Sequence, residues 1–147
     1  MKKHLRLTVA LLACAPVPLA AQPDLQQSHI EANVPPLESF EGFLDRDLLA
    51  YFKASGIQTA TAVVYKPLRN GPTQSGLSYP KYYLWVKVLL GSKVVQEGAV
   101  RVAAVEYTHF EVTNFMSKTQ IQEAPSSVGS VFPVALVQSV RSLAGAK

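Results

Sequence analysis

Cysteine is almost absent from this sequence: Cys14 is the one cysteine in 147 residues, and charged residues make up no more than 16%. A single thiol excludes a zinc module built from several cysteines and a small scaffold held together by disulfides. Because 48% of the residues are hydrophobic, a mostly disordered chain is excluded too. The length suits a single domain.

Recognisable catalytic and cofactor motifs are also missing. The sequence has no G-x-S-x-G elbow, no P-loop, no G-x-G-x-x-G and no closely spaced histidine pair. It therefore predicts no catalytic set, no cofactor and no metal site. The basic residues of the central region are spread out, which does not favour nucleic-acid binding; they are Lys66, Arg69, Lys81, Lys87, Lys93 and Arg101.

The first 21 residues have the three-part pattern of a secretory signal. Lys2, Lys3 and Arg6 precede an apolar run over residues 7–15, and small residues follow up to Ala21. A membrane-spanning helix needs about 20 apolar residues, and this run is shorter. We expect residues 1–21 to be a signal peptide cleaved after Ala21, which makes the protein exported, either periplasmic or secreted, with no membrane span in the mature chain.

Residues 11–14 allow a second interpretation of the N-terminus. Leu11-Leu12-Ala13-Cys14 resembles the lipobox of bacterial lipoproteins. The resemblance implies that Cys14 is lipidated and anchors the protein at the envelope. If the cut falls after Ala21 instead, the mature chain has no cysteine and its core must stabilise it without a disulfide.

The formal net charge of +4 comes mostly from this N-terminal segment. Residues 1–21 contain three of the 14 Lys and Arg residues and none of the ten acids. The remaining chain therefore has 11 basic and 10 acidic residues, and its charge indicates no acidic partner.

The pattern from residue 22 onward predicts a leader followed by a helix. Residues 22–36 are polar, contain three prolines and predict a flexible leader or tether. From residue 37 the apolar residues recur at helical spacing, with Gly56 as the end signal; they are Phe40, Phe43, Leu44, Leu48, Tyr51 and Phe52.

Four strands are expected after this helix, over residues 57–68, 82–90, 94–106 and 108–115. Gly91-Ser92 predicts a two-residue hairpin turn, and Gly98 indicates a bulge or bend. Residues 82–90 are almost wholly apolar, so both faces of this strand should be covered. On the fourth strand, Phe110 and Val112 should point inward.

The remaining residues predict short C-terminal helices. Ser117-x-x-Gln120 has capping-box spacing, and Ser130 is the expected cap of a final helix that ends before Gly145. Residues 37–147 thus predict a single α+β domain in which the N-terminal helix packs on a curved four-stranded antiparallel sheet. This element order is similar to that of cystatin-like and NTF2-like domains.

Aromatic residues gather where the Gly/Pro-rich loop 70–80 meets the second strand. Tyr79 and Tyr83 flank Lys81 there, and we expect these three to contact a protein or small-ligand partner in the envelope. Core packing is the competing explanation for the aromatic residues.

His109 and Glu111 on the fourth strand form the candidate acid–base pair.

Three functions of the protein remain open. The first is a non-catalytic binding or accessory module of the cell envelope. The second is a small α+β enzyme that uses His109 or Glu111 in a helix–sheet cavity, and the third is a lipid-anchored structural protein. A polar-lined pocket favours the enzyme, whereas a solid apolar interior favours the binding module.

Overall fold

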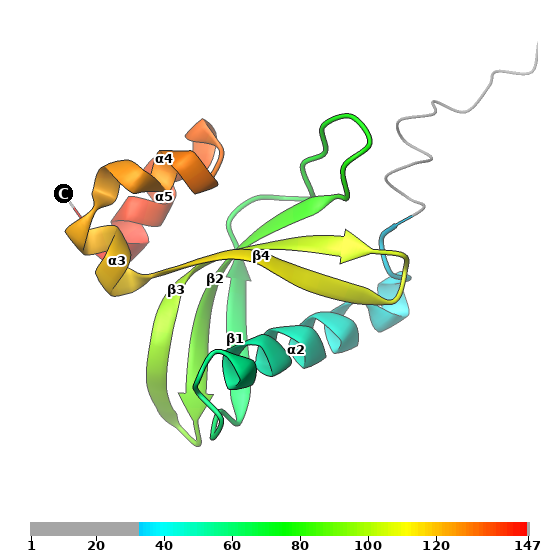
Figure 1. The fold of residues 1–147 in the computed structure, drawn as a ribbon, viewed down its shortest axis with the longest axis horizontal. Helices are drawn as coiled ribbons and strands as arrows, with labels where there is room; N and C mark the ends of the chain where they lie inside the picture. The colour runs from blue at the N-terminus through cyan, green and yellow to red at the C-terminus, as the bar shows by residue number, and fades with distance from the viewer. Residues whose placement is uncertain (1–32, 147) are drawn as a thin grey trace, which may run out of the picture.

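The computed structural model describes residues 33–146 (Figure 1). The predicted signal peptide, Cys14 and residues 22–32 of the predicted leader lie outside the described residues. The last residues of that leader are packed on the domain: Asn33 and Pro35 are buried, and the Asn33 carbonyl accepts a hydrogen bond from the Tyr107 N–H at 3.2 Å. The packed part of the chain therefore includes residues before the helix that begins at Leu37.

Helix α2 spans Leu37–Ala54 and carries the predicted apolar stripe. Leu44, Leu48 and Phe52 are at most 1% exposed, and each buried side chain of this size contributes about 1.5–3 kcal/mol through the hydrophobic effect. The helix ends as predicted, because Ser55 is the C-cap and Gly56 follows with φ +109°.

The four strands form one antiparallel sheet in the order β1-β2-β3-β4. They are β1 (Ala62–Pro67), β2 (Lys81–Leu90), β3 (Lys93–Val105) and β4 (His109–Ser117). Figure 1 shows that the sheet is strongly curved, with α2 on its inner face. The α-helix and four-stranded antiparallel sheet predicted from the sequence are confirmed.

The predicted hairpin turn at Gly91-Ser92 joins β2 to β3, and Gly91 has φ +60°. The turn from β3 to β4 uses Glu106 and Tyr107, which both have positive φ although neither is glycine. β1 is shorter than predicted: it begins at Ala62, and residues 57–61 form an irregular segment with a turn at residues 58–59.

Gly98 differs from its predicted role. The β2–β3 register is continuous through Gly98, and the shifts lie at Val88/Leu89 and Arg101/Val102 instead. A Cβ at Gly98 would lie 2.2 Å from the Met116 carbonyl oxygen. This glycine therefore permits a close approach between β3 and β4 rather than a bulge.

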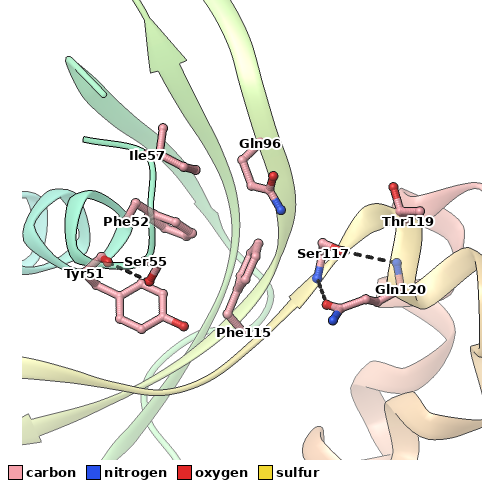
Figure 2. A pocket seen from close by; sticks show the side chains of 9 residues that line it. All are labelled: Tyr51, Phe52, Ser55, Ile57, Gln96, Phe115, Ser117, Thr119 and Gln120. Atoms are coloured by element: carbon pink, nitrogen blue, oxygen red, sulfur yellow. Dashed lines mark hydrogen bonds between the residues drawn. The ribbon is translucent and has the colours of Figure 1, made fainter. Parts of the chain in front are cut away.

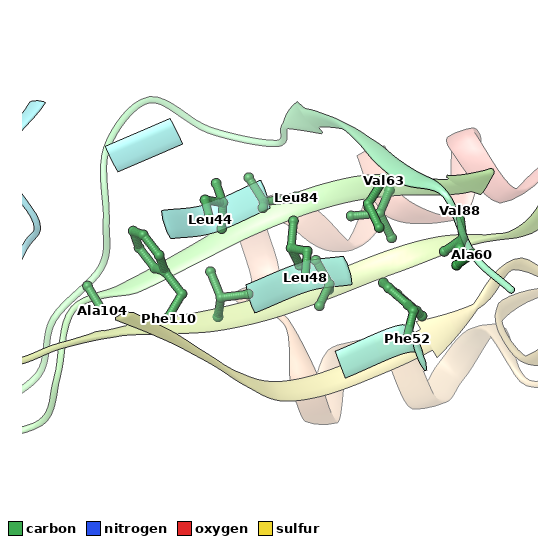
Figure 3. Close-up of a cluster of buried hydrophobic side chains, with 12 residues drawn as sticks. Leu44, Leu48, Phe52, Ala60, Val63, Leu84, Val88, Ala104 and Phe110 are labelled. Carbon is green, nitrogen blue, oxygen red and sulfur yellow. The ribbon is translucent and has the colours of Figure 1, made fainter. Parts of the chain in front are cut away.

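Both faces of β2 are buried along its middle, from Tyr83 to Val86, as its apolar sequence predicts. The inner face packs against α2 in a core that is apolar throughout (Figure 3); it comprises Leu44, Leu48, Phe52, Ala60, Val63, Leu84, Val86, Val88, Val100, Val102, Ala104 and Phe110. The outer face carries a second core beneath the C-terminal helices; it comprises Tyr83, Trp85, Ala99, Ile121, Val128, Phe132, Leu136, Val140 and Ala144.

The C-terminal segments are α3 (Lys118–Glu123), the 3-10 turn η1 (Pro125–Ser127), α4 (Val128–Val131) and α5 (Val134–Ala144). The capping box at Ser117 and Gln120 is formed as predicted. Ser130, the expected cap of the final helix, lies inside α4 instead, and α5 begins after Pro133. The reason is that a proline pushes the preceding residue out of helical geometry, and Phe132 is extended, with ψ 147°.

Among residues 33–146 there is no helix both long and apolar enough to cross a membrane.

Candidate functional site

The three residues of the predicted aromatic contact have different environments. Tyr83 is only 6% exposed, packs near Phe132 and shares a 2.7 Å hydrogen bond between its hydroxyl and that of Thr73. Tyr79 is 38% exposed, and its carbonyl accepts a hydrogen bond from the Lys81 Nζ at 2.9 Å. Tyr83 is therefore a core residue that anchors the loop, and Tyr79 and Lys81 alone remain at the surface.

Lys81 lies near a second cation on the outer face of the sheet. Burial lowers its pKa, and the positive charge of Arg101 lowers it further. Arg101 is itself held in place, since its Nε donates to the Thr113 hydroxyl at 2.9 Å and its Nη1 donates to the Val131 carbonyl at 3.1 Å. This arrangement ties Arg101 of β3 to β4 and α4.

The candidate acid–base pair lies on the opposite face of β4 from α2. The His109 Nε2 and Glu111 Oε1 atoms are 3.6 Å apart, and the His109 Nδ1 lies 3.1 Å from the Thr108 hydroxyl. Phe110, between them in sequence, points into the α2 core. Side chains alternate along a strand, so His109 and Glu111 point away from the helix–sheet interior; Glu111 is exposed and His109 is half-buried.

A cleft of about 470 Å³ opens at the C-terminal end of α2, where β4 leads into α3 (Figure 2). Its size falls within the range of about 300–1,000 Å³ typical of small-ligand sites. Figure 2 shows the end of α2 on one side and the start of α3 on the other. The lining residues are Tyr51, Phe52, Ser55, Ile57, Gln96, Phe115, Ser117, Thr119 and Gln120.

No ionisable carboxylate, lysine, arginine or histidine lines this cleft within the described chain. Its floor is aromatic, since the rings of Phe52 and Phe115 meet edge to face with centroids 5.0 Å apart. Several polar groups are already used: the Ser55 hydroxyl donates to the Tyr51 carbonyl, and Ser117 and Gln120 bond each other in the capping box. Among the residues described, the side chains of Tyr51, Gln96 and Thr119 make no hydrogen bond and so remain free to meet a ligand.

A smaller groove of about 280 Å³ lies at the other end of α2, beside the end of β1. Its lining is mainly apolar and aromatic, and Arg69 is the single charged side chain among the described residues that line it. The lining residues are Phe40, Leu44, Tyr65, Pro67, Arg69, Asn70, Gly71, Tyr82, Tyr83 and Leu84.

Sequence reasoning missed both concave sites. The cleft draws on residues from α2, from the turn after it, and from β3, β4 and α3, so no local pattern marks it. The capping-box motif at Ser117 and Gln120 is the one sequence signal near the cleft, and it indicates helix-end chemistry. Phe115 reaches the cleft because the register shift in β4 changes the alternation after Val112.

Residues 33–146 contain no group of three or more histidine, cysteine or acidic side chains placed to hold a metal ion. Comparisons of the chain with protein-family models, with curated proteins and with solved structures found no match.

Proposed function

We propose that this protein is an exported, non-catalytic binding or accessory module of the cell envelope, and that the cleft at the end of α2 is its ligand site. The three-part pattern of residues 1–21 supports export. The mixed aromatic and uncharged polar lining of the cleft supports binding.

The observation that carries this proposal is the solid interior between α2 and the sheet. Its central side chains, which include Leu48, Val86, Val88, Val100 and Val102, are fully buried. An acid–base enzyme of the helix–sheet type needs a cavity at this place with titratable groups pointing into it. His109 and Glu111 point to the other face instead, which favours a binding role over catalysis.

The chemistry of the cleft restricts its ligand to an uncharged molecule. An ionic ligand would lose its hydration without gaining an opposite charge, whereas an apolar ring or chain would pack on Phe52, Phe115 and Ile57. The free groups of Tyr51, Gln96 and Thr119 would bond hydroxyl or amide groups at the edge of the ligand. We therefore propose a neutral ligand with one apolar face and a polar rim.

The element order also supports a finer proposal about the fold. A helix followed by four consecutive antiparallel strands is the order that cystatin-like and NTF2-like domains share. We propose this architecture for the domain on that order alone.

An NMR titration of the mature exported protein tests the ligand site. The probes are small neutral, anionic and cationic fragments built on one common aromatic ring. Neutral fragments should give saturable shifts at Tyr51, Gln96 and Phe115, and the double substitution Gln96→Ala with Thr119→Ala should remove them. Tyr79→Phe, on the loop, is the matched control and should leave them unchanged. The proposal would be contradicted if a charged fragment bound more tightly than the neutral one, or if the largest chemical-shift changes were at His109 and Glu111.

A further inference from the structure

The outer edge of β1 presents unpaired backbone groups. The Leu68 N–H donates to the Tyr83 carbonyl at 2.9 Å, which makes these two residues a hydrogen-bonded pair. Paired and unpaired residues alternate along an antiparallel strand, so the N–H and C=O groups of Val63 and Tyr65 point away from β2. Within residues 33–146 no backbone or side-chain group bonds to them.

The start of the opposite edge of the sheet is covered by α2. The Phe110 N–H, which points outward from β4, donates to the Asp47 carboxylate at 2.7 Å. The Arg46 Nη2 donates to the Thr108 carbonyl at 3.0 Å. The start of the β4 edge is thus protected by side chains of the helix, whereas Val63 and Tyr65 on the β1 edge are left open.

An apolar groove lies directly beside the open edge. It is the groove of about 280 Å³ at the end of α2, and Tyr65 and Pro67 of β1 form one of its walls. Phe40 and Leu44 of α2 and Tyr82 of β2 form the rest of its apolar surface. This volume lies just below the range of about 300–1,000 Å³ for small-molecule pockets, and it suits one large side chain.

The helix wall above this edge is acidic. Glu41 and Asp45 are one helical turn apart and therefore lie on the same side of α2. Both lie close to Tyr65, whose pKa is raised first by burial and then by the charges of Asp45 and Glu41. Neither carboxylate forms an ion pair or hydrogen bond with any other residue of the described chain, so both are free to attract a cation.

We propose that the β1 edge binds an extended segment of a partner protein by strand addition. The segment pairs with the backbone of Val63 and Tyr65, places a large apolar side chain in the groove, and carries Lys or Arg two residues away. A spacing of two residues puts the basic side chain on the same face as the apolar one, toward Glu41 and Asp45. Pro67 lacks an N–H, so the added ladder ends there.

A synthetic peptide with blocked ends tests this proposal on the mature, full exported protein. The probe is about seven residues long, with Leu at its centre, Lys two residues away on each side, and Thr at the other positions. Isothermal titration should show saturable binding, and hydrogen exchange followed by NMR should show new protection of the Val63 and Tyr65 amides. Binding without that protection would overturn the proposal.

Two controls separate strand pairing from simple charge attraction. The double variant Glu41→Gln with Asp45→Asn should weaken binding about five-fold, since each exposed pair contributes modestly. Glu111→Gln with Glu123→Gln removes the same charge elsewhere and should leave the affinity unchanged. A peptide N-methylated at alternate amides should not bind; equal affinity for it would overturn the proposal.

A second copy of this chain is the competing occupant of the edge. Sedimentation of the peptide-free protein should show a monomer, and a dimer that protects Val63 and Tyr65 from exchange would overturn the proposal. This site is independent of the cleft at the other end of α2. Loss of peptide binding at β1 therefore leaves the neutral-ligand titration unaffected, and the two proposals fail separately.

Discussion

The Asp47 carboxylate on α2 accepts a hydrogen bond from the Phe110 N–H on β4 at 2.7 Å. The same carboxylate pairs with Arg46, whose guanidinium lies over the Phe43 ring and donates to the Thr108 carbonyl. Two neighbouring residues of one helix therefore satisfy both an N–H and a C=O at the start of β4. This contact positions α2 on the sheet and covers the start of the β4 edge.

Asp47→Ala should destabilise the protein by about 1–3 kcal/mol, because it leaves the Phe110 N–H without its charged acceptor. Urea unfolding followed by circular dichroism measures the change. Asp45→Ala, two residues away and exposed, is the control and should change stability by less than about 0.5 kcal/mol. Equal effects of the two substitutions would show that the contact to Phe110 does not stabilise the fold.

Gly98→Ala should destabilise the protein by about 1–3 kcal/mol or more, because the new Cβ would overlap the Met116 carbonyl on β4. Gly42→Ala is the matched control on α2, where a Cβ meets no atom within 4 Å. It should stabilise the protein by about 0.5–1 kcal/mol, because alanine is the better helix former. Thermal unfolding measures both changes: the midpoint should fall for Gly98→Ala and rise for Gly42→Ala.

The free energy of unfolding should fall in acid, partly because the Glu97 carboxylate is stabilised in the folded protein. Burial by itself raises the pKa of Glu97, but the hydrogen bond from Trp85 and the charges of Lys118 and Lys87 outweigh burial and hold it below its ordinary value. A carboxyl with a lowered folded-state pKa stabilises the fold above its unfolded-state pKa, and this contribution is lost as the pH falls through the folded-state pKa.

Glu97→Gln should therefore be less stable than the wild type at neutral pH, and the two should converge as the pH falls below the ordinary glutamate range. Urea unfolding at a series of pH values measures the difference. A constant difference at every pH would refute the role of the Glu97 charge.

Tyr83→Phe should lower stability by about 1 kcal/mol by removing the hydrogen bond to the Thr73 hydroxyl. It should also increase hydrogen exchange in loop 70–80, because this bond ties the loop to β2. Tyr79→Phe, which removes an exposed hydroxyl, should do neither. An unchanged loop in Tyr83→Phe would mean that the backbone pairing of Thr73 with Lys81 holds the loop alone.

The exported protein should begin at Gln22, with a mass that corresponds to loss of residues 1–21. Intact-mass measurement of protein from the cell envelope checks this, and Cys14→Ser should be processed identically. A mature chain that begins at Cys14 and carries the added mass of a lipid would instead support the anchored form.

The spacing of apolar residues and the local turn and cap motifs predicted those parts of the fold that depend on residues close together in the sequence. The stripe on α2, the apolar β2, the turn at Gly91 and the capping box at Ser117 all follow from short-range geometry and are present in the structure. The predicted cap at Ser130 failed because a stronger local signal, Pro133, lay nearby.

The candidate sites could be predicted much less well. Tyr83 and Tyr79 have similar sequence surroundings, yet one is buried against Phe132 and the other is exposed. The difference depends on the C-terminal helices, which cover the outer face of β2 at Tyr83. A single strand pattern carries no information about which distant segment will cover it.

By itself, the sequence determined that the part of the chain described by the structure has a long helix, four consecutive strands and a helical end, since the periods of its apolar residues are local properties. The tertiary structure alone decided where the concave surfaces lie and which sheet edge is open. The register shift in β4 turns Phe115 toward α2, and Asp47 reaches Phe110 across 63 positions of the chain. Such contacts depend on the angle at which α2 crosses the sheet. Packing between side chains that are far apart in sequence sets this angle.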